Sequence, residues 1–431
     1  MNNRFRNLAI GAALLGLGAF IGTIGPVQRA VSQGMVQITT LAGTEQISLN
    51  YPCTVSCFIT TQTLQGYGRQ SPGSGGVVNS IIGGDYGTNP FQRGTANATG
   101  VHISSTATYT ADQTWMVGGA SSSIDWSQQT SAADTPPRSG GSLRMQRTSG
   151  NTDTAAICWG HTFSSEESYR FQNHTAFYEL WAQTGANYSG GAVTVSVYYG
   201  TGANQSTASL LAGSWTNQTT ASAATIASGS TPPTITSPTT FTPTATQARF
   251  SMAFTVPLMV STSDVSQVGM KACWTPSGTA GANDWIEFSL EQLEVNDTGS
   301  PGAFDHLPGS LTYVRAHKFL AVIPEPASGV GVGVGSTAST TTCSITIALP
   351  DIMIAAPTLS FAGTALSAST WTVTHVVTAT ALSTPYLAVN TANTPTAINL
   401  TATVASGLTA GQACVLTGAG GGSKIVASAE L

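Results

Sequence analysis

The sequence predicts an all-β protein, and three observations carry this prediction. Charged residues are 8% of the 431 residues, against about 25% in an average soluble domain. Serine, threonine, glycine, alanine and asparagine fill long uncharged stretches, and frequent β-branched residues favour strands over disorder. Short runs alternate apolar and polar residues, which is the period of a strand that buries one face. The length suits two to three domains, and we expect a small N-terminal β module followed by two larger β domains.

Residues 1–34 form an apolar N-terminal segment. Leu8–Val27 carries no charge and follows two arginines, and as a helix it is long enough to cross about 30 Å of lipid. Three interpretations are open: a secretory signal, a membrane anchor, or an apolar segment that is buried where the protein docks on a larger particle. A signal is disfavoured because no clear small-x-small cleavage site precedes Gln28-Arg29.

Residues 35–87 are expected to form a small β docking module and a linker. The apolar residues of 35–65 group into three runs of short-strand length. Gln70–Gly87 is rich in glycine and serine, which is typical of a boundary between domains. We therefore place the start of the next domain at residue 88.

Residues 88–306 contain the most regular strand patterns. Ala192–Gly202 and Ala248–Pro257 alternate well. Near the end of the region, DWIEFSLEQLEV (Asp284–Val295) gathers acids in a chain that is almost without charge. Its alternation slips at Gln292–Leu293, which predicts a bulge or an edge bend.

Residues 307–329 form a connector, and residues 330–431 form the C-terminal β domain. Alternating runs at CSITIALP, TWTVTHVVTA and TATVAS predict strands in this domain. Gly418–Gly422 is expected to be a flexible turn between two of its strands.

Short phrases of residues 88–306 follow one another in a distinctive order. NPFQRGT (Asn89–Thr95) opens the region, YTADQTWM (Tyr109–Met116) follows, and QLE (Gln292–Glu294) and AFD (Ala303–Asp305) close it. In this order they resemble the modules of tail-fibre and related appendage proteins of tailed bacteriophages. The tryptophan of the family's opening phrase and the arginine of its second phrase are absent here. The shared order is more specific than any single phrase.

The C-terminal region resembles the β-domain that ends many phage fibre proteins. The matching phrases are IAAPT (Ile354–Thr358), LTAGQA (Leu408–Ala413) and AEL (Ala429–Leu431). Ile354 stands where the family carries an arginine, so a salt bridge made by that arginine in relatives is missing. With the preceding region, the resemblance covers about three quarters of the chain, excluding the N-terminal part.

The resemblance implies an architecture and a function. It implies a central jelly-roll β-sandwich of carbohydrate-binding type, a C-terminal β-sandwich tip, and a homotrimer whose copies bury apolar faces together. It implies a virion structural protein on the exterior of a tailed phage, attaching to host-surface polysaccharide and to other virion proteins through residues 1–65. It favours burial of Leu8–Val27 in the particle over a membrane anchor. Two alternatives remain: a capsid decoration or head-fibre protein without a specific ligand, and a secreted or cell-surface bacterial carbohydrate-binding protein.

The six cysteines divide evenly along the chain. One interpretation is three disulfides, one in each region, formed in an oxidising setting. The pairs would be Cys53–Cys57, Cys158–Cys273 and Cys343–Cys414. The alternative is buried free thiols that act as small apolar residues, because pairing cannot be read from a sequence.

No set of reactive residues predicts an enzyme. Glu287 and Glu291 lie four residues apart on a strand, or about 13 Å, which exceeds the roughly 5–9.5 Å between the carboxylates of a glycosidase. We interpret them as acids that protect a sheet edge. His161 and His174 lack the spacing of a metal site. We expect no catalytic residue, no metal and no cofactor.

Binding of a glycan is the more plausible chemistry. Aromatic faces stack on the C–H groups of sugar rings, while amides and acids bind the hydroxyls. The candidates are Trp215, Tyr198, Tyr199, Trp126 and Trp115. Trp215 lies in the polar run GSWTNQT and is expected to be the most exposed of them. The formal net charge of −5 offers no basic footprint, so we expect no nucleic-acid partner.

Overall fold

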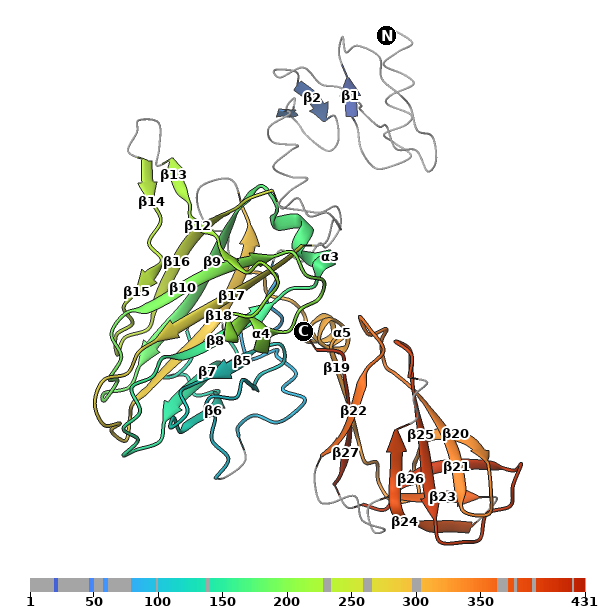
Figure 1. Ribbon diagram of the computed structural model, residues 1–431. Helices are drawn as coiled ribbons and strands as arrows, with labels where there is room; N and C mark the ends of the chain where they lie inside the picture. Colours follow the sequence, from blue (N-terminus) through green and yellow to red (C-terminus); the bar gives the residue numbers. More distant parts are fainter. Residues whose placement is uncertain are drawn as a thin grey trace. The chain divides into compact units, whose positions relative to one another are not determined.

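The computed structural model describes residues 19–21, 46–49, 57–60, 79–97, 100–136, 139–227, 234–258, 266–296, 304–362, 371–375, 378–389, 393–420 and 422–430. The chain divides into two compact units, Met1–Val78 and Asn79–Leu431. The all-β prediction is confirmed, because strands dominate both units (Figure 1).

The first unit contains one antiparallel sheet. Its strands β1 (Ala19–Ile21), β2 (Gln46–Leu49) and β3 (Cys57–Thr60) pair in the order β1-β2-β3. Most of Leu8–Val27 lies outside the described residues, so its interpretation stays a prediction. Among the described residues no helix is long and apolar enough to span a membrane. Cys53 is also outside them, and the Cys53–Cys57 pair is not described.

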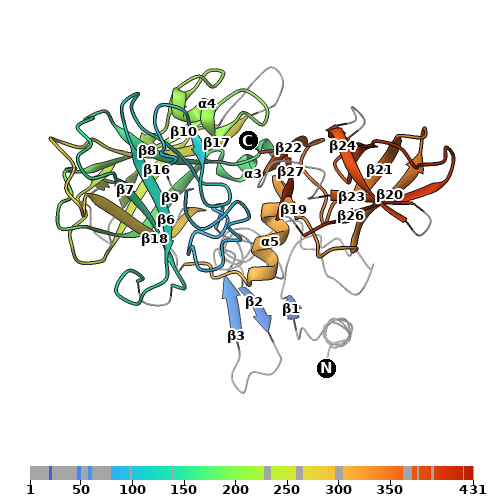
Figure 2. The same ribbon diagram turned by 90° about the horizontal axis from the view of Figure 1, so that it is seen from below.

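The second unit begins with a sandwich of two antiparallel sheets. One sheet has the order β11-β10-β17-β8-β5-β4, with β15 also paired to β10, and the other has the order β12-β16-β9-β18-β7-β6. The strands of the first sheet are β4 (Thr108–Tyr109), β5 (Trp115–Val117), β8 (Ile157–Thr162), β10 (Val193–Gly200), β11 (Thr219–Thr220), β15 (Thr240–Phe241) and β17 (Gln267–Trp274). Those of the second are β6 (Ile124–Gln129), β7 (Ser142–Arg147), β9 (His174–Thr184), β12 (Ser222–Ala223), β16 (Ala248–Val256) and β18 (Trp285–Val295). The predicted jelly-roll sandwich is confirmed (Figures 1 and 2).

Period-2 alternation places one large apolar core between the two sheets. Trp159 of β8 stacks on Phe288 of β18 with ring centroids 4.4 Å apart, so the two sheets meet at this pair. Short helices cover the sandwich at its margins: α3 (Ser165–Ser168), a 3-10 turn (Tyr169–Phe171) and α4 (Thr207–Ala212). A separate hairpin joins β13 (Thr225–Ala227) to β14 (Thr234–Thr236).

The sandwich starts earlier than the sequence indicates. Ile81 and Tyr86 are buried in its core, and Ser80 N donates to Leu293 O at 2.9 Å along β18. Gly84 approaches the backbone of Glu291 so closely that a Cβ atom would lie 2.0 Å from the Glu291 carbonyl oxygen. The glycines of 79–87 therefore serve this packing, and the domain boundary at residue 88 is too late.

The C-terminal part closes into a barrel. Six strands follow one another around it in the order β20-β21-β25-β24-β23-β26. They are β20 (Gly331–Thr337), β21 (Thr342–Ala348), β23 (Trp371–His375), β24 (Thr378–Val389), β25 (Ala397–Val404) and β26 (Ala413–Gly418). The predicted C-terminal sandwich thus has its two layers joined at both edges, which leaves no unpaired edge strand.

The predicted connector 307–329 is structured. It holds α5 (Gly309–His317) and β19 (Leu320–Pro324), and β19 pairs in the order β19-β27-β22 with β27 (Lys424–Ser428) and β22 (Thr358–Ala362). Leu320 and Val426 of this small sheet pack on Tyr109 of the sandwich. The connector is therefore part of the C-terminal domain and carries its contact with the jelly roll.

Two of the three predicted disulfides are present. Cys158 and Cys273 join the neighbouring strands β8 and β17, and Cys343 and Cys414 join β21 and β26 inside the barrel. They enclose 115 and 71 residues of chain, respectively. Closing loops of this size removes enough entropy from the unfolded chain to stabilise each domain by about 4 kcal/mol in a chain-entropy model.

A buried carboxylate links the C-terminal end of the chain to the jelly roll. Glu430 Oε2 accepts a hydrogen bond of 2.7 Å from Arg93 Nη2, and the Arg93 guanidinium lies 4.1 Å from the ring centroid of Tyr109. Burial raises the pKa of the Glu430 carboxyl from its ordinary value of 4.5 to about 7, against the opposing effects of Arg93 and of hydrogen bonds from Tyr109 and Ser428. Asp112, which also faces this group, has its own pKa raised by burial.

This carboxyl predicts a loss of stability between pH 4.5 and 7. A folded-state pKa above the unfolded value means that the folded chain binds the proton more tightly, so the contribution is full at low pH and disappears as the pH rises through about 7. Between pH 4.5 and 7 the free energy of unfolding should fall in the unmodified chain. We expect this fall to be about 3 kcal/mol larger than in Glu430→Gln, which lacks the carboxyl. Urea unfolding at a series of pH values measures the difference. Parallel pH profiles of the two proteins would contradict the prediction.

Candidate functional site

The outer face of the sheet β12-β16-β9-β18-β7-β6 collects polar and aromatic side chains. Tyr178, Leu180 and Ala182 of β9 point into the core, so the alternate residues of this strand point outward. They are Phe177, Glu179, Trp181 and Gln183. The register places Ser289 and Arg249 on either side of Trp181, and Gln292 and Ser251 on either side of Glu179. We call this surface the outer face.

Two arginine–glutamate pairs are built into the outer face. Arg249 of β16 donates from Nη2 to both carboxylate oxygens of Glu179, at 2.6 and 2.8 Å. Arg144 of β7 pairs with Glu287 of β18, which also accepts a hydrogen bond of 2.7 Å from Gln183 Nε2. The pairs fix the acids in place, because each carboxylate is engaged by a neighbouring strand.

Burial governs the acidity of both glutamates. The side chains of Glu179 and Glu287 are only 4% and 1% exposed. Burial raises the pKa of each carboxyl, while Arg249 at Glu179 and Gln183 and Arg144 at Glu287 act in the opposite direction. The acids are thus held as hydrogen-bonded acceptors under the surface, and Arg249 is the partner whose side chain reaches the surface.

Trp181 provides an aromatic surface in the middle of this face. It is half-buried on β9, which has β16 on one side and β18 on the other. In the described part of the chain no aromatic ring or cation stacks on it, whereas the guanidinium of Arg144 lies 4.2 Å from the ring centroid of Trp285. Trp181 is therefore an indole of this face that is half-buried and carries no stacked ring or cation among the described residues.

Two segments cover the ends of β9 and leave Trp181 between them. The loop from β6 to β7 covers one end, where Gln183 Nε2 donates to Ala133 O at 3.3 Å and Ser139 Oγ lies 2.7 Å from Ser289 Oγ. At the other end Phe177 packs under Ala224 and Ala253. A ligand on Trp181 would lie between these two segments.

The five aromatic residues proposed from the sequence do not meet on this face. Trp215 is 4% exposed, because α4 covers it and its Nε1 donates to Ser206 O at 2.9 Å. Trp126 is 5% exposed and stacks on Phe91 in the core. The expectation that Trp215 is exposed is therefore wrong, and Trp126 is a core residue.

The other three candidates lie on or under the opposite sheet. Trp115 is half-buried with its ring at a right angle to that of Tyr109. Tyr199 packs on the core, and Tyr198 points outward near Lys271, whose Nζ lies 5.7 Å from its ring centroid. The sequence indicates correctly that one of these adjacent tyrosines faces away from the core, but it faces away from Trp181 as well.

Glu291 lies inside the sandwich, and not at a sheet edge. A bulge between Ser289 and Gln292, with Leu290 at φ +48°, turns its carboxylate into the core. There it accepts hydrogen bonds from Tyr86 Oη at 2.6 Å, from Trp159 Nε1 at 2.9 Å and from Tyr178 Oη, and His161 Nε2 lies 3.0 Å away. We call these five side chains the Glu291 cluster. The predicted bulge is present, two residues from the predicted position.

The edge-protection interpretation of Glu287 and Glu291 is wrong. β18 lies between β9 and β7 rather than at an edge, and both carboxylates are buried. Burial alone raises the pKa of the Glu291 carboxyl, but the charge of His161 and hydrogen bonds from His161, Tyr178 and Tyr86 outweigh it and hold that pKa below its ordinary value. Burial, followed by the charge of Glu291, raises the pKa values of Tyr86 and Tyr178, so both phenols are donors at neutral pH.

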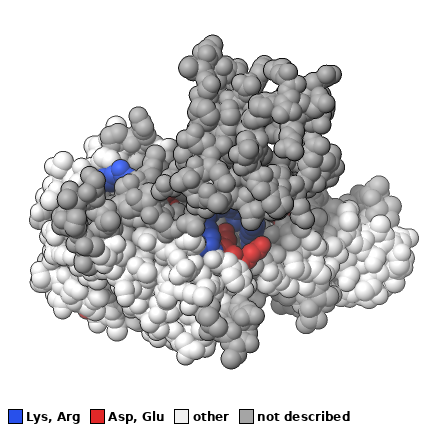
Figure 3. All heavy atoms as spheres, turned by 90° about the horizontal axis from the view of Figure 1, so that it is seen from above, with Lys and Arg blue, Asp and Glu red and all other residues white. Residues whose placement is uncertain are grey.

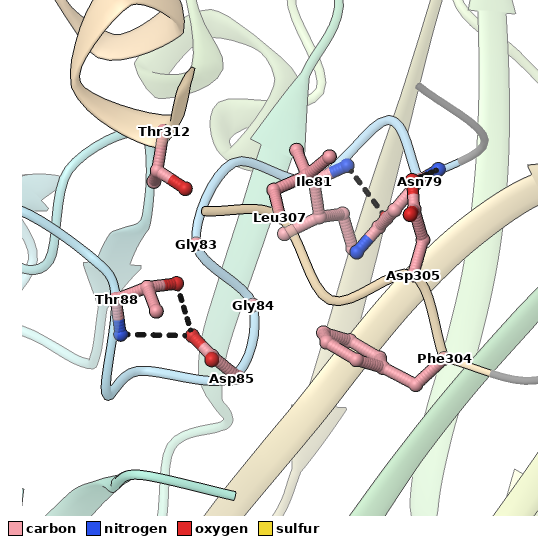
Figure 4. Close-up of a pocket in the computed structure, with 10 residues that line it drawn as sticks. All are labelled: Asn79, Ile81, Gly83, Gly84, Asp85, Thr88, Phe304, Asp305, Leu307 and Thr312. Carbon is pink, nitrogen blue, oxygen red and sulfur yellow. Dashed lines mark hydrogen bonds between the residues drawn. The ribbon is translucent and has the colours of Figure 1, made fainter. Parts of the chain in front are cut away.

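One hollow beside residues 79–85 is shown in Figure 4, and it offers few groups to a ligand. In it Asp85 already accepts hydrogen bonds from Thr88 N and Oγ1, at 3.0 and 2.7 Å, and Asn79 Oδ1 accepts one from Ile81 N at 2.9 Å. Among the described residues no three His, Cys, Asp or Glu side chains are grouped to hold a metal ion.

In a second group of charged residues, acids and arginines neutralise one another. Figure 3 shows blue and red atoms side by side near the middle of one face. Arg315 interacts with Glu167, Arg170 and Asp305, and burial lowers its pKa to about 10. Its Nη2 donates to Ser80 O at 3.0 Å, so the group fastens α5 to the start of the sandwich.

No family model and no curated protein matches the chain. Solved structures with partial similarity include a CBM4 module, at 14% identity over 40% of this chain and 87% of that chain with a TM-score of 0.23. A putative sugar binding protein from Bacteroides thetaiotaomicron matches at 10% identity over 51% of this chain and 100% of its own, with a TM-score of 0.28. A xylan-binding domain from CBM 22 matches at 11% identity over 43% and 89%, with a TM-score of 0.23. Similarity at this level does not indicate which ligand this chain binds.

Proposed function

We propose that the jelly roll binds a glycan on its outer face, with Trp181 as the stacking surface. The observation that carries this proposal is a half-buried indole on which no described ring or cation stacks, flanked in register by Arg249 and Ser289 and next along β9 to Glu179 and Gln183. Aromatic stacking on a sugar ring, combined with acceptors and donors for its hydroxyls, is the chemistry of carbohydrate recognition. The fixed geometry of the ion pairs supports binding with little reorganisation.

We further propose that the face binds without cleaving its ligand. Glu179 and Glu287 are each engaged by an arginine from a neighbouring strand. A glycosidase needs one carboxyl group as proton donor and a second as nucleophile or base on opposite sides of the bond. Acids that are held beneath the surface by arginine and glutamine can orient the N–H donors of these partners. This role supports a binding protein over an enzyme.

The biological setting that we propose is the exterior of a tailed phage. The ordered phrases from Asn89–Thr95 to Ala429–Leu431 support it, as does a chain with 8% charged residues. In this setting the jelly roll attaches to host-surface polysaccharide, residues 1–65 join the chain to other virion proteins, and three copies assemble. Light scattering of the purified chain measures the copy number, and immunogold labelling of intact particles measures the location.

Trp181→Ala is expected to weaken glycan binding about tenfold or more, because an aromatic residue at the centre of a contact commonly contributes more than 1 kcal/mol. A glycan array identifies the ligand, and calorimetry measures the affinity of the folded variant. Tyr198→Ala is the matched control, since it removes an aromatic side chain from the outside of the opposite sheet, and its affinity should be unchanged.

Two outcomes would contradict the proposal. Equal affinities of Trp181→Ala and the unmodified chain would show that the outer face is not the site. A folded chain that binds no glycan, with unchanged phage adsorption for Trp181→Ala, would favour a decoration protein without a ligand. If the protein is instead found on bacterial surfaces in the absence of particles, the bacterial carbohydrate-binding alternative gains support.

A further inference from the structure

We propose that the ligand of the outer face is an uncharged, hydroxyl-rich polysaccharide and that glycans bearing carboxylates, sulfates or phosphates are excluded. This inference rests on the proposed function and narrows it to one class of ligand. Its basis is the sign and the pairing of the described acids and arginines on the face that holds Trp181.

Acids outnumber bases on the described part of the outer face. Outward positions of the strands carry Asp125, Glu179, Glu287 and Glu294, and the loop from β6 to β7 adds Asp134. The bases are Arg144 and Arg249. Five negative and two positive charges leave a net charge of −3 on these described residues. Asp125 is the most distant, three strands from β9, or about 15 Å.

Both arginines are already occupied by carboxylates of the protein. Arg249 contacts both oxygens of Glu179, and Arg144 contacts Glu287 and lies 3.4 Å from Asp134. Proteins commonly bind carboxylate and phosphate through the planar fork of an arginine. Here an anionic ligand would have to displace an internal acid from that fork and leave it buried without its partner.

Burial makes this displacement costly. Glu179 and Glu287 have almost no contact with water that could replace the arginine, and a buried charge that loses its partner is strongly unfavourable. A ligand anion placed beside them is also repelled in surroundings less polar than water. We expect each anionic group near Trp181 to weaken binding about tenfold or more.

The groups that remain for a ligand suit hydroxyls. Ser251 lies beside Glu179 in register and is half-buried, and a hydroxyl both donates and accepts. Ser289, on the other side of β9, is buried and already donates to Asp85 O and Gly141 O. Sugar hydroxyls can donate to carboxylate oxygens and accept from guanidinium N–H groups without breaking either pair. A neutral sugar chain therefore meets complementary groups where an anionic chain does not.

The test compares neutral and anionic glycans on the same protein. The full chain is applied to an array that contains neutral, uronate-bearing, sialylated and phosphorylated glycans at 20 mM and 500 mM NaCl. We expect the bound glycans to be neutral, with affinities that change less than twofold between the two salt concentrations, since no ligand charge is screened. Affinity electrophoresis in hydroxyethyl cellulose and carboxymethyl cellulose gives a matched polymer pair if β-glucans are among the bound glycans.

A double variant tests whether charge, and not the shape of the ligand, excludes anionic glycans. Asp125→Asn with Asp134→Asn removes two partly exposed acids. It keeps the hydrogen bonds from Arg249 to Glu179 and from Arg144 to Glu287. The double variant should raise binding of anionic glycans at 20 mM NaCl about tenfold while leaving neutral binding unchanged. Anionic glycans as the main ligands at low salt, with binding lost in Arg249→Gln, would overturn this inference and leave the glycan-binding function standing. An array with no bound glycan of any class overturns the proposed function and the inference together.

Discussion

We expect Glu291→Leu to lower the free energy of unfolding of the jelly roll by about 4 kcal/mol. The substitution replaces the carboxylate with an apolar side chain of similar size. It thereby removes the acceptor that Tyr86, Tyr178 and Trp159 share. Trp159 Nε1 and Tyr178 Oη then lack the acceptor that they use here, at about 1–3 kcal/mol apiece, and Tyr86 Oη keeps only the long contact of 3.5 Å with Thr114 Oγ1. His161, whose Nδ1 lies 3.0 Å from Gln113 O, loses its second contact as well.

Urea unfolding followed by tryptophan fluorescence measures this effect. All tryptophans except Trp371 lie in residues 88–306, and Trp159 touches Glu291, so the signal reports the jelly roll. Glu291→Gln retains the shape and part of the hydrogen bonding and should lose about half as much. Glu166→Gln, an exposed acid on α3, is the control and should stay within about 0.5 kcal/mol of the unmodified chain. A loss below 1 kcal/mol for Glu291→Leu would mean that the donors find other partners.

The Glu291 cluster also marks the limit of prediction from the sequence. Period-2 alternation predicted the strand Trp285–Val295 and a bulge within it, because both are local properties of the chain. Alternation does not tell which sheet neighbours flank the strand. Without the order β9-β18-β7, acids on alternate positions suggest a solvated edge, whereas their partners come from strands more than 100 residues away in sequence.

Trp215 and Trp181 show the same limit for the candidate site. The sequence neighbours of Trp215 are polar, which predicts exposure, but its neighbours in space are α4 and Gly269, where an added Cβ atom would lie 2.8 Å from the indole. Trp181 follows Phe177–Leu180, where apolar residues occupy both odd and even positions of the strand. The sequence therefore does not show which side chains point outward. Glu179 in the middle of that run was the available signal, because a strand that places an acid between apolar residues has one polar face.

The buried pair of Arg147 and Asp284 predicts a loss of similar size at another place in the sandwich. Arg147 Nη1 donates to Asp284 Oδ2 at 2.7 Å, and both side chains are at most 1% exposed. The same guanidinium donates to Asn151 O, Asp153 O and Gly278 O, and Ser189 donates to Asp284 from its backbone and its hydroxyl. One arginine and one aspartate thereby hold together the loops β7–β8, β9–β10 and β17–β18.

Arg147→Met should lower the free energy of unfolding by about 4 kcal/mol, because it leaves the Asp284 carboxylate buried without a cation. Arg147→Lys should recover only part of this loss, since an ammonium cannot reach the three carbonyls and the carboxylate together. The double variant Arg147→Met with Asp284→Leu should be more stable than Arg147→Met alone, because removing both charges eliminates the unpaired one. Lys318→Gln, at an exposed cation, is the control. A double variant that is less stable than Arg147→Met would contradict this expectation. It would mean that the Asp284 carboxylate stabilises the loops through Ser189 even without the arginine.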